Sequence, residues 1–101
     1  MATYRGYRYQ DSGELVVTKD GESLSPAPSQ KVWNHSPDGF QWGYGGSGPA
    51  QLALALLLDV TGDPDLSANL HQRFKMEYVA GWGEYWEFST EGIQAWVDKN
   101  K

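Results

Sequence analysis

The stretch from Ala50 to Leu58 is the feature that most limits how this chain can fold. Every residue in it except Gln51 is alanine or leucine, the two residues that favour helix most strongly. Pro49 suits the first helical position, where its missing N–H costs nothing, and Gly62 is a natural terminator. A helix that is apolar on nearly every side must be buried. We therefore expect a central helix, covered by a sheet on one surface and by another helix or a partner subunit on the other.

The residues before this helix predict a small antiparallel sheet. Turn signals at Asp11–Gly13 and Asp20–Gly21 separate short segments of strand character, and the second turn is typical of a tight hairpin. The expected strands cover residues 3–9, 14–19 and 22–24. Ser25–Ser29 contains two prolines and indicates a connector. The segment that follows is long for a loop, so a short strand is expected at Val32–Trp33 or at Phe40–Trp42.

Two more helices and one more strand are predicted after the central helix. Asp63 is a suitable cap for a helix that runs to about Ala80. Its buried face is marked by apolar residues at every fourth position, namely Leu66, Leu70, Phe74 and Tyr78. Residues 84–88 alternate acidic and aromatic side chains, as a strand does. Ser89 or Thr90 then caps a last helix with the apolar stripe Ile93, Trp96 and Val97. The expected fold is one α+β domain over residues 1–101, with the small sheet packed on three carboxy-terminal helices.

Composition excludes several classes of protein. The net charge is −5, which argues against a broad surface for nucleic acid. Without cysteine there is no disulfide and no thiolate metal site, and we expect no metal and no cofactor. No apolar segment approaches the roughly 20 residues that span a bilayer, so we expect a cytoplasmic protein. We also expect a homo-oligomer, because one small sheet covers an all-round apolar helix poorly.

The glycine-rich run before the central helix is the candidate binding site. Gly43–Gly48 has the spacing G-x-G-x-x-G, but two helices follow it, so a dinucleotide-binding fold is rejected. Pro49 stands where a phosphate-binding loop has its lysine. Free backbone N–H groups at a helix start can still hold an anion. Ser47 either contributes its hydroxyl to that site or only caps the helix.

Aromatic and basic residues around this loop complete a pocket the size of a nucleotide. Four aromatic side chains could stack on a base, each contact contributing about 1–3 kcal/mol, and Arg5 and Arg8 could add positive charge from the sheet. The predicted ligand-binding residues are Arg5, Trp33, His35, Phe40, Trp42, Tyr44, Gly45, Gly46, Ser47 and Gly48. The alternative is that the glycines only let the loop pack closely and that the large aromatics belong to the core.

The two histidines and the acidic residues have simpler interpretations. His35 could act on a phosphate or with Ser36, Ser47 or Asp38, but we favour a role in ordering its loop. His71 is expected to be a surface or packing residue, and the two histidines lack the spacing of a metal site. Glu84, Glu87 and Glu91 predict a solvated edge, which could also meet a basic protein surface.

The block from His35 to Asp59, HSPDGFQWGYGGSGPAQLALALLLD, resembles a small uncharacterised family of phages, bacteria and archaea, domain of unknown function 6166. An amino-terminal Tyr-Arg-Gly and the segments LHQRFKMEYVA and STEGIQAWV are similar too, so the resemblance covers most of the chain. It implies no known activity or catalytic residue. It implies a context, that of small accessory proteins of phages or mobile elements, among which proteins that counter host defence are common.

Three functions remain open at this point. The first is a non-catalytic protein that sequesters a small phosphate-bearing, nucleotide-derived defence signal, in the host cytoplasm if a phage encodes it. The second is an acidic inhibitor of a host defence complex, comparable to anti-CRISPR proteins. The third is a small hydrolase that uses His35.

Overall fold

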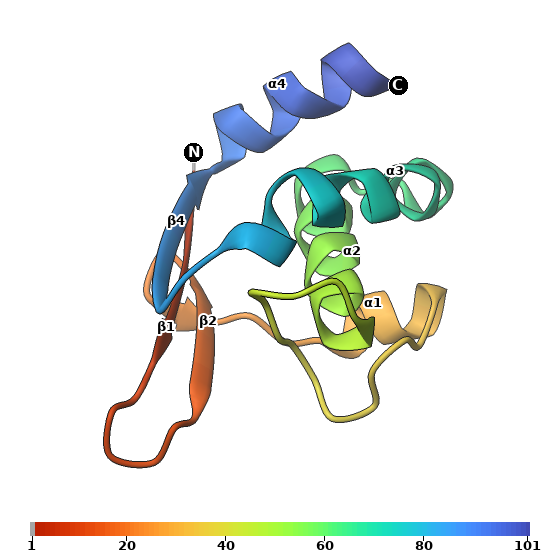
Figure 1. The fold of residues 1–101 in the computed structure, drawn as a ribbon. Helices are drawn as coiled ribbons and strands as arrows, with labels where there is room; N and C mark the ends of the chain where they lie inside the picture. The colour runs from red at the N-terminus through yellow and green to blue at the C-terminus, as the bar shows by residue number, and fades with distance from the viewer. Residues whose placement is uncertain (1) are drawn as a thin grey trace.

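The computed structural model describes residues 2–101 as one sheet packed against a group of helices (Figure 1). Four strands pair antiparallel in the order β3-β2-β1-β4. They are β1 (Thr3–Arg8), β2 (Leu15–Lys19), β3 (Glu22–Ser23) and β4 (Tyr85–Ser89). The helical elements are α1 (Ala27–Val32), α2 (Ser47–Thr61), α3 (Pro64–Glu77), the short 3₁₀ turn η1 (Val79–Gly81) and α4 (Thr90–Asn100). This architecture confirms the predicted α+β fold.

The hairpin between β2 and β3 is closed by the two-residue turn expected from the sequence. Asp20 and Gly21 have φ values of 52° and 86°, so both adopt the left-handed conformation that a type I′ turn requires. Lys19 pairs with Glu22 across the turn. β3 is very short, and it covers only the end of β2 that is nearest the turn.

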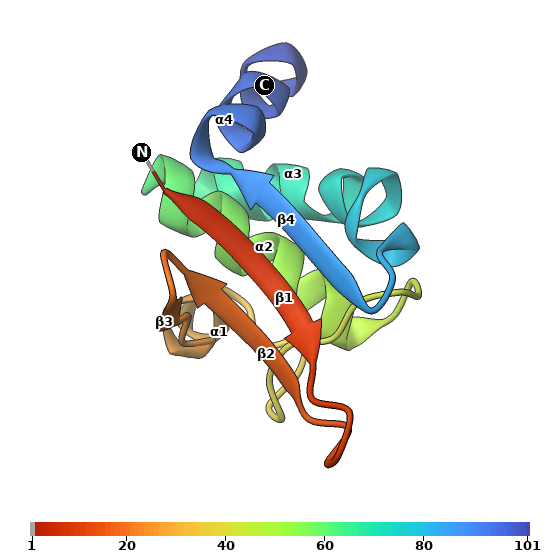
Figure 2. The same cartoon turned by 90° about the vertical axis from the view of Figure 1, so that its left-hand side faces the viewer.

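The sheet and α3 enclose the central helix within a single chain. Five apolar side chains of α2 have no solvent exposure, namely Leu52, Ala53, Leu54, Leu56 and Leu57. Tyr4, Val17 and Trp86 of the sheet and Phe74 of α3 belong to the same core cluster. In Figure 2 α2 passes behind the sheet, α4 extends beyond the end of β4, and no helix covers the face of the sheet toward the viewer. Because α2 is already covered on both sides, its apolar character does not require a second subunit.

One glycine lets β1 and β4 pack closely over this core. Gly6 lies opposite Trp86, and a Cβ at Gly6 would overlap the indole ring. Trp82 stacks on Trp86 with the ring centroids 4.1 Å apart. The alternation of residues 84–88 thus predicts β4 correctly. In the structure, this strand places Trp86 in the core.

Three local predictions are wrong. Ser25–Ser29 is not a simple connector, because Ala27–Val32 is helical. The expected short strand is absent from both places, since Val32 is the last residue of this helix and Phe40–Trp42 is not a strand. Pro26 and Pro28 lie at the start of α1, where no intrahelical N–H is needed. The central helix begins at Ser47 instead of Pro49, with Gly46 as its N-cap, so Ser47 does not cap it.

The ends of the later helices confirm the capping signals. The Asp63 carboxylate accepts a hydrogen bond from the Leu66 N–H, and the Ser89 hydroxyl accepts one from the Gly92 N–H. Gly62 ends α2 in the left-handed conformation, with φ 67°. Between residues 2 and 101, no helix is both long and apolar enough to cross a membrane.

Candidate functional site

The glycines of the loop before α2 bring parts of this chain close together. Gly43 has φ 87° and its N–H donates to the Val79 carbonyl at 3.0 Å. Gly48 is buried, and a Cβ there would overlap the Gln41 side chain. A Cβ at Gly46 would overlap the Tyr44 ring. These glycines therefore allow close packing of the loop on α2 and on η1. Close packing was the alternative to ligand binding that the sequence left open for them.

The aromatic residues predicted to bind a base point in different directions. Trp42 is only 6% exposed; its indole donates to the Gly83 carbonyl at 2.6 Å and packs edge-on against Trp86. Trp42 belongs to the core and is not accessible for stacking on a ligand. Trp33 and Tyr44, in contrast, are 53% and 51% exposed. Phe40 is partly buried and lies in a separate groove, described below.

Arg5 is also distant from the loop. It lies on β1 with its side chain on the face of the sheet away from the helices, because its neighbours Tyr4 and Gly6 face the core. Its guanidinium is 3.4 Å from the Glu87 carboxylate of β4. The structure thus gathers the predicted site residues into two groups, Trp33 with His35 and Tyr44 with Gly45–Gly48, and leaves Arg5, Phe40 and Trp42 apart.

The two histidines, which are far apart in the sequence, form a direct pair. The Nε2 atoms of His35 and His71 are 2.9 Å apart, and the indole of Trp33 stacks on His35 with centroids 4.5 Å apart. His71 is fully buried on α3, and its Nδ1 is 2.6 Å from the Ala68 carbonyl. A carbonyl only accepts, so the His71 Nδ1 carries a proton. The lowered pKa values of both imidazoles favour the neutral rings, and in that state the His71 Nε2 accepts from the His35 Nε2–H.

Burial is the main cause that lowers the pKa of both imidazoles below their ordinary value. For His35, repulsion from a protonated His71 and from the Lys75 ammonium lowers the pKa further. Within residues 2–101, the side-chain hydrogen bond of the His35 ring is made with His71, and neither the Ser36 nor the Ser47 hydroxyl forms one to this ring. The pair holds the loop that carries His35 against α3, which agrees with the ordering role favoured from the sequence. His71 is a packing residue, the second of the two alternatives considered for it.

Gln51, the one polar residue in the apolar stretch, holds the same loop from inside. Its Oε1 accepts from the backbone N–H groups of His35 and Ser36 at 2.8 and 3.0 Å. Its Nε2 donates to the Ser29 hydroxyl, which in turn donates to the Pro26 carbonyl. Gln51 is completely buried, and these partners satisfy its amide. The polar residue in the middle of an apolar run was the sequence signal for this contact.

Lys75 is a residue near the glycine loop that the sequence did not indicate. Its ammonium lies 3.4 Å from the Gly45 carbonyl, and α2 has no acidic residue in its first turn. The positive end of α2 and one lysine therefore lie at the same side of the molecule. α3 brings Lys75 there, so no local pattern in the loop could have identified it.

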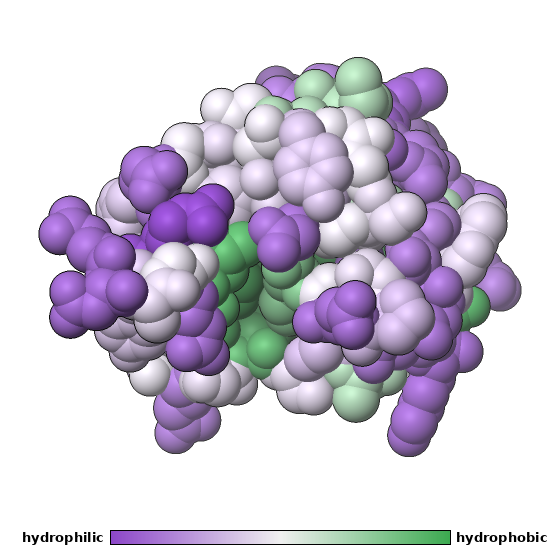
Figure 3. Space-filling model, turned by 60° about the horizontal axis from the view of Figure 1, so that its bottom comes forward, coloured by the Kyte–Doolittle hydropathy of each residue, from purple (hydrophilic) through white to green (hydrophobic). Residues whose placement is uncertain are grey.

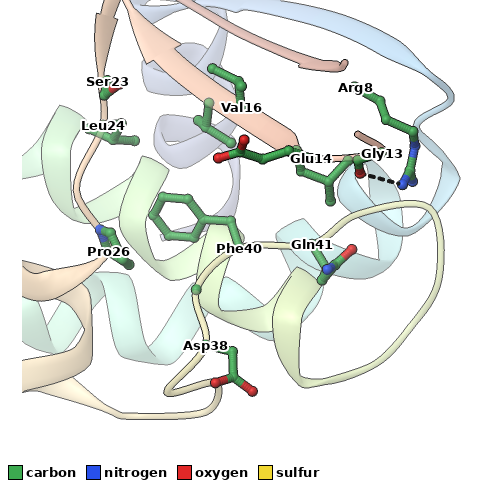
Figure 4. Close-up of a pocket in the computed structure, with 13 residues that line it drawn as sticks. Arg8, Gly13, Glu14, Val16, Ser23, Leu24, Pro26, Asp38, Phe40 and Gln41 are labelled. Carbon is green, nitrogen blue, oxygen red and sulfur yellow. Dashed lines mark hydrogen bonds between the residues drawn. The ribbon is translucent and has the colours of Figure 1, made fainter. Parts of the chain in front are cut away.

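A groove of about 490 Å³ lies between the end of the hairpin and the segment Asp38–Gln41. Figure 3 shows the molecule from this end, with an apolar hollow between hydrophilic rims. Leu15, Leu24 and Phe40 line it, and all three are partly buried against the core. Figure 4 shows Glu14 on the hairpin side and Asp38 on the loop side, with the Phe40 ring between the two walls. Of the predicted site residues, only Phe40 lies here.

One wall of this groove is a free strand edge. The Glu14 carbonyl accepts from the Tyr9 N–H of the neighbouring strand segment, whereas the Val17 carbonyl accepts from Leu24 on the opposite side. Since alternate residues of a strand direct their backbone groups to opposite sides, the N–H and C=O of Leu15 point away from β1. β3 pairs only with Thr18 and Lys19, so it does not reach Leu15. The backbone of Leu15 therefore faces the groove.

The charged residues of the groove differ in their pairing. Arg8 contacts the Glu84 carboxylate at 3.5 Å and donates to the Gly13 carbonyl at 3.2 Å. Glu14 and Asp38 form no ion pair with any residue from 2 to 101. The rim consequently presents two uncompensated carboxylates. No three side chains of His, Asp or Glu come together as a metal site in the described chain.

Comparison with known proteins adds a family but no activity. No curated protein and no solved structure matches this chain. A family model does match it, over residues 4–99, which is nearly the whole chain. The chain therefore belongs to the family of unknown function DUF6166.

Proposed function

We propose that this protein is a non-catalytic binding protein, and that it takes an extended segment of a partner protein into the groove as an added strand beside β2. The observation that carries this proposal is the free backbone edge at Leu15 next to an apolar floor. An exposed strand edge binds extended peptides through main-chain hydrogen bonds, and adjacent pockets select their side chains. This is a specific form of the protein-interaction function considered from the sequence.

The shape of the groove supports a peptide over a compact small molecule. Small-molecule sites usually bury most of the ligand surface. This groove is open along its length between the hairpin and the loop (Figure 3). A strand lying in it would gain hydrogen bonds on one side and apolar contact beneath, while its far side stayed in solvent.

The test uses Leu15→Pro with Leu15→Ala as its matched control. Proline removes the N–H that faces the groove, and it is tolerated at the first residue of a strand, as Leu15 is in β2. Peptides of twelve residues would be selected from a displayed random library on the natural protein. We expect the enriched peptides to lose binding to Leu15→Pro and to keep most of it with Leu15→Ala. Equal binding to both variants, or failure to enrich any peptide, would count against the proposal.

The contact between Lys75 and the Gly45 carbonyl favours a second candidate, a small phosphate-bearing, nucleotide-derived ligand at the start of α2. Tyr44 is exposed beside this point and could stack on a base. The test is a thermal-shift measurement with ADP-ribose and a cyclic dinucleotide. Stabilisation that Lys75→Gln abolishes and Lys99→Gln preserves would support it. An action against host defence, by sequestering a signal or by blocking a protein, remains a prediction for either candidate.

A further inference from the structure

The groove also indicates what kind of segment it takes. We propose that the occupant is a basic extended segment, which directs an apolar side chain at Phe40 and places lysine or arginine beside Glu14 and Asp38. This inference rests on the proposed strand addition, and it adds the chemistry of the partner.

The pleat of the sheet determines which side chains of the occupant are apolar. Leu15 and Val17 face the core side of the sheet, because Val17 belongs to the core cluster and Leu15 packs against it. A strand added beside β2 continues this pleat, so every second side chain points the same way as Leu15. In that direction lie Leu24 and Phe40, which are partly buried and apolar.

The carboxylates of Glu14 and Asp38 determine which charge the remaining side chains of the occupant should carry. Glu14 and Asp38 lie on opposite walls of the groove and have no cationic partner in the described chain (Figure 4). An occupant would remove water from both, and an acidic one would also be repelled. A lysine or arginine compensates them. The net charge of −5 acts in the same direction at long range and favours encounter with a basic partner.

Arg8 does not reverse this preference. Its guanidinium is already engaged by Glu84 and by the Gly13 carbonyl. It therefore closes the end of the groove near the first turn, where it adds little attraction for an acidic occupant.

The extent of the free edge sets the length of the paired segment. The edge is occupied as far as Val17, because β3 pairs with Thr18 and Lys19 and the Leu24 N–H beyond it donates to the Val17 carbonyl. From there to the start of β2 at Leu15, at about 3.3 Å per residue, this edge accommodates two or three residues of an added strand. Backbone pairing over so short an edge sets the register of the occupant, and the apolar contact with Leu24 and Phe40 and the two carboxylates add affinity and selectivity to it.

The experiment uses synthetic octapeptides in which valine alternates with lysine, serine or glutamate. Alternate N-methylation leaves each peptide one edge for pairing and prevents its self-assembly. Each peptide is titrated into the ¹⁵N-labelled full chain. We expect the Lys–Val peptide to shift the Leu15 and Val17 amide resonances and to bind most tightly. We expect the double variant Glu14→Gln/Asp38→Asn to bind it about tenfold more weakly. The control Glu22→Gln/Asp65→Asn changes the net charge equally at two exposed carboxylates outside the groove, and should bind it as the natural protein does.

The outcomes separate this inference from the proposed function. If the Ser–Val or Glu–Val peptide binds as tightly and shifts Leu15 and Val17, the basic occupant is wrong and strand addition at β2 stands. If no peptide perturbs these two amides, or if the shifts fall on β4 instead, both are wrong. Weakening of the Lys–Val peptide by the control variant as much as by Glu14→Gln/Asp38→Asn would show attraction by net charge alone, and would overturn the inference.

Discussion

The glycine loop and the hairpin groove meet where Gln41 packs against Gly48, yet they differ in what fills them. The loop contains the most conspicuous motif of the sequence. The space beside most of its glycines is filled by other residues of the same chain. The groove is built from residues with no motif, and it remains open (Figures 3 and 4). A conspicuous sequence motif can thus indicate close packing of a loop. An accessible surface, in contrast, arises where a strand such as β3 ends early.

The reason for the difference lies in how each region satisfies its backbone. The Gly43 N–H is bonded to Val79, and the loop that carries His35 is held by Gln51. At the groove, β3 ends after pairing with Thr18 and Lys19, and the Leu15 backbone has no neighbouring strand on that side. Unpaired strand edges are the places where another chain can add.

The largest effect that tests this comparison is expected from substituting two tryptophans of the predicted site. Trp42→Ala should lower the free energy of unfolding by about 3–5 kcal/mol, because it removes a buried indole from the core. Trp33→Ala should cost much less, since the Trp33 side chain is 53% exposed. Urea denaturation of both variants measures the two effects. Equal and small losses would show that Trp42 is not a core residue.

A smaller effect is expected within the glycine loop itself. Gly48→Ala should cost about 1–3 kcal/mol, because the new methyl group overlaps Gln41 against a buried helix start. Gly45→Ala is the matched control, since its Cβ would meet only the Met76 sulfur at 3.8 Å. Thermal unfolding of the two variants makes the comparison. If Gly45→Ala were the more damaging change, the packing role of Gly48 would be wrong.

Local signals in the sequence predict most of the fold. The Asp20–Gly21 turn, the caps at Asp63 and Ser89, and the apolar run of α2 each act within a few residues, and the structure confirms them. The sequence does not predict α1, because its prolines resemble those that interrupt a helix. Proline is nevertheless compatible with a first helical turn. Proline is thus compatible with a helix at its first turn and disrupts it in the interior, so its presence alone does not decide whether a segment is helical.

The candidate site was much less predictable, because it depends on contacts between distant segments. Composition does not distinguish Trp42 from Trp33, whose exposure is decided by which neighbours approach. The contacts of His35 with His71 and of Lys75 with Gly45 are created by the packing of α3. The groove exists because β3 is only two residues long, a boundary that propensity alone does not define.

The histidine pair predicts a pH effect that distinguishes the loop from the groove. The pKa values of His35 and His71 are lowered in the folded protein, mainly by burial, whereas the unfolded chain titrates near the ordinary value of 6.5. The unfolded state thus binds more protons as the pH falls below about 6.5, and folding stability declines until the lowered folded pKa values are passed. An NMR titration of both imidazoles should give midpoints below 6.5. His71→Leu should flatten the stability profile between about pH 7 and 5.5; an unchanged profile would assign the acid sensitivity to other groups.

The smallest effect is expected at the groove, where the carboxylates have no structural partner. Glu14→Gln and Asp38→Asn should each change the free energy of unfolding by no more than about 0.5 kcal/mol, as for surface positions without special contacts. Asp59→Asn is the informative contrast, because Asp59 accepts a hydrogen bond from the buried Tyr4 hydroxyl and lies 2.8 Å from the Lys19 ammonium. It should destabilise clearly more. If the groove carboxylates proved equally important for folding, they would be part of the scaffold. Their free charge would then no longer be an argument for a basic partner.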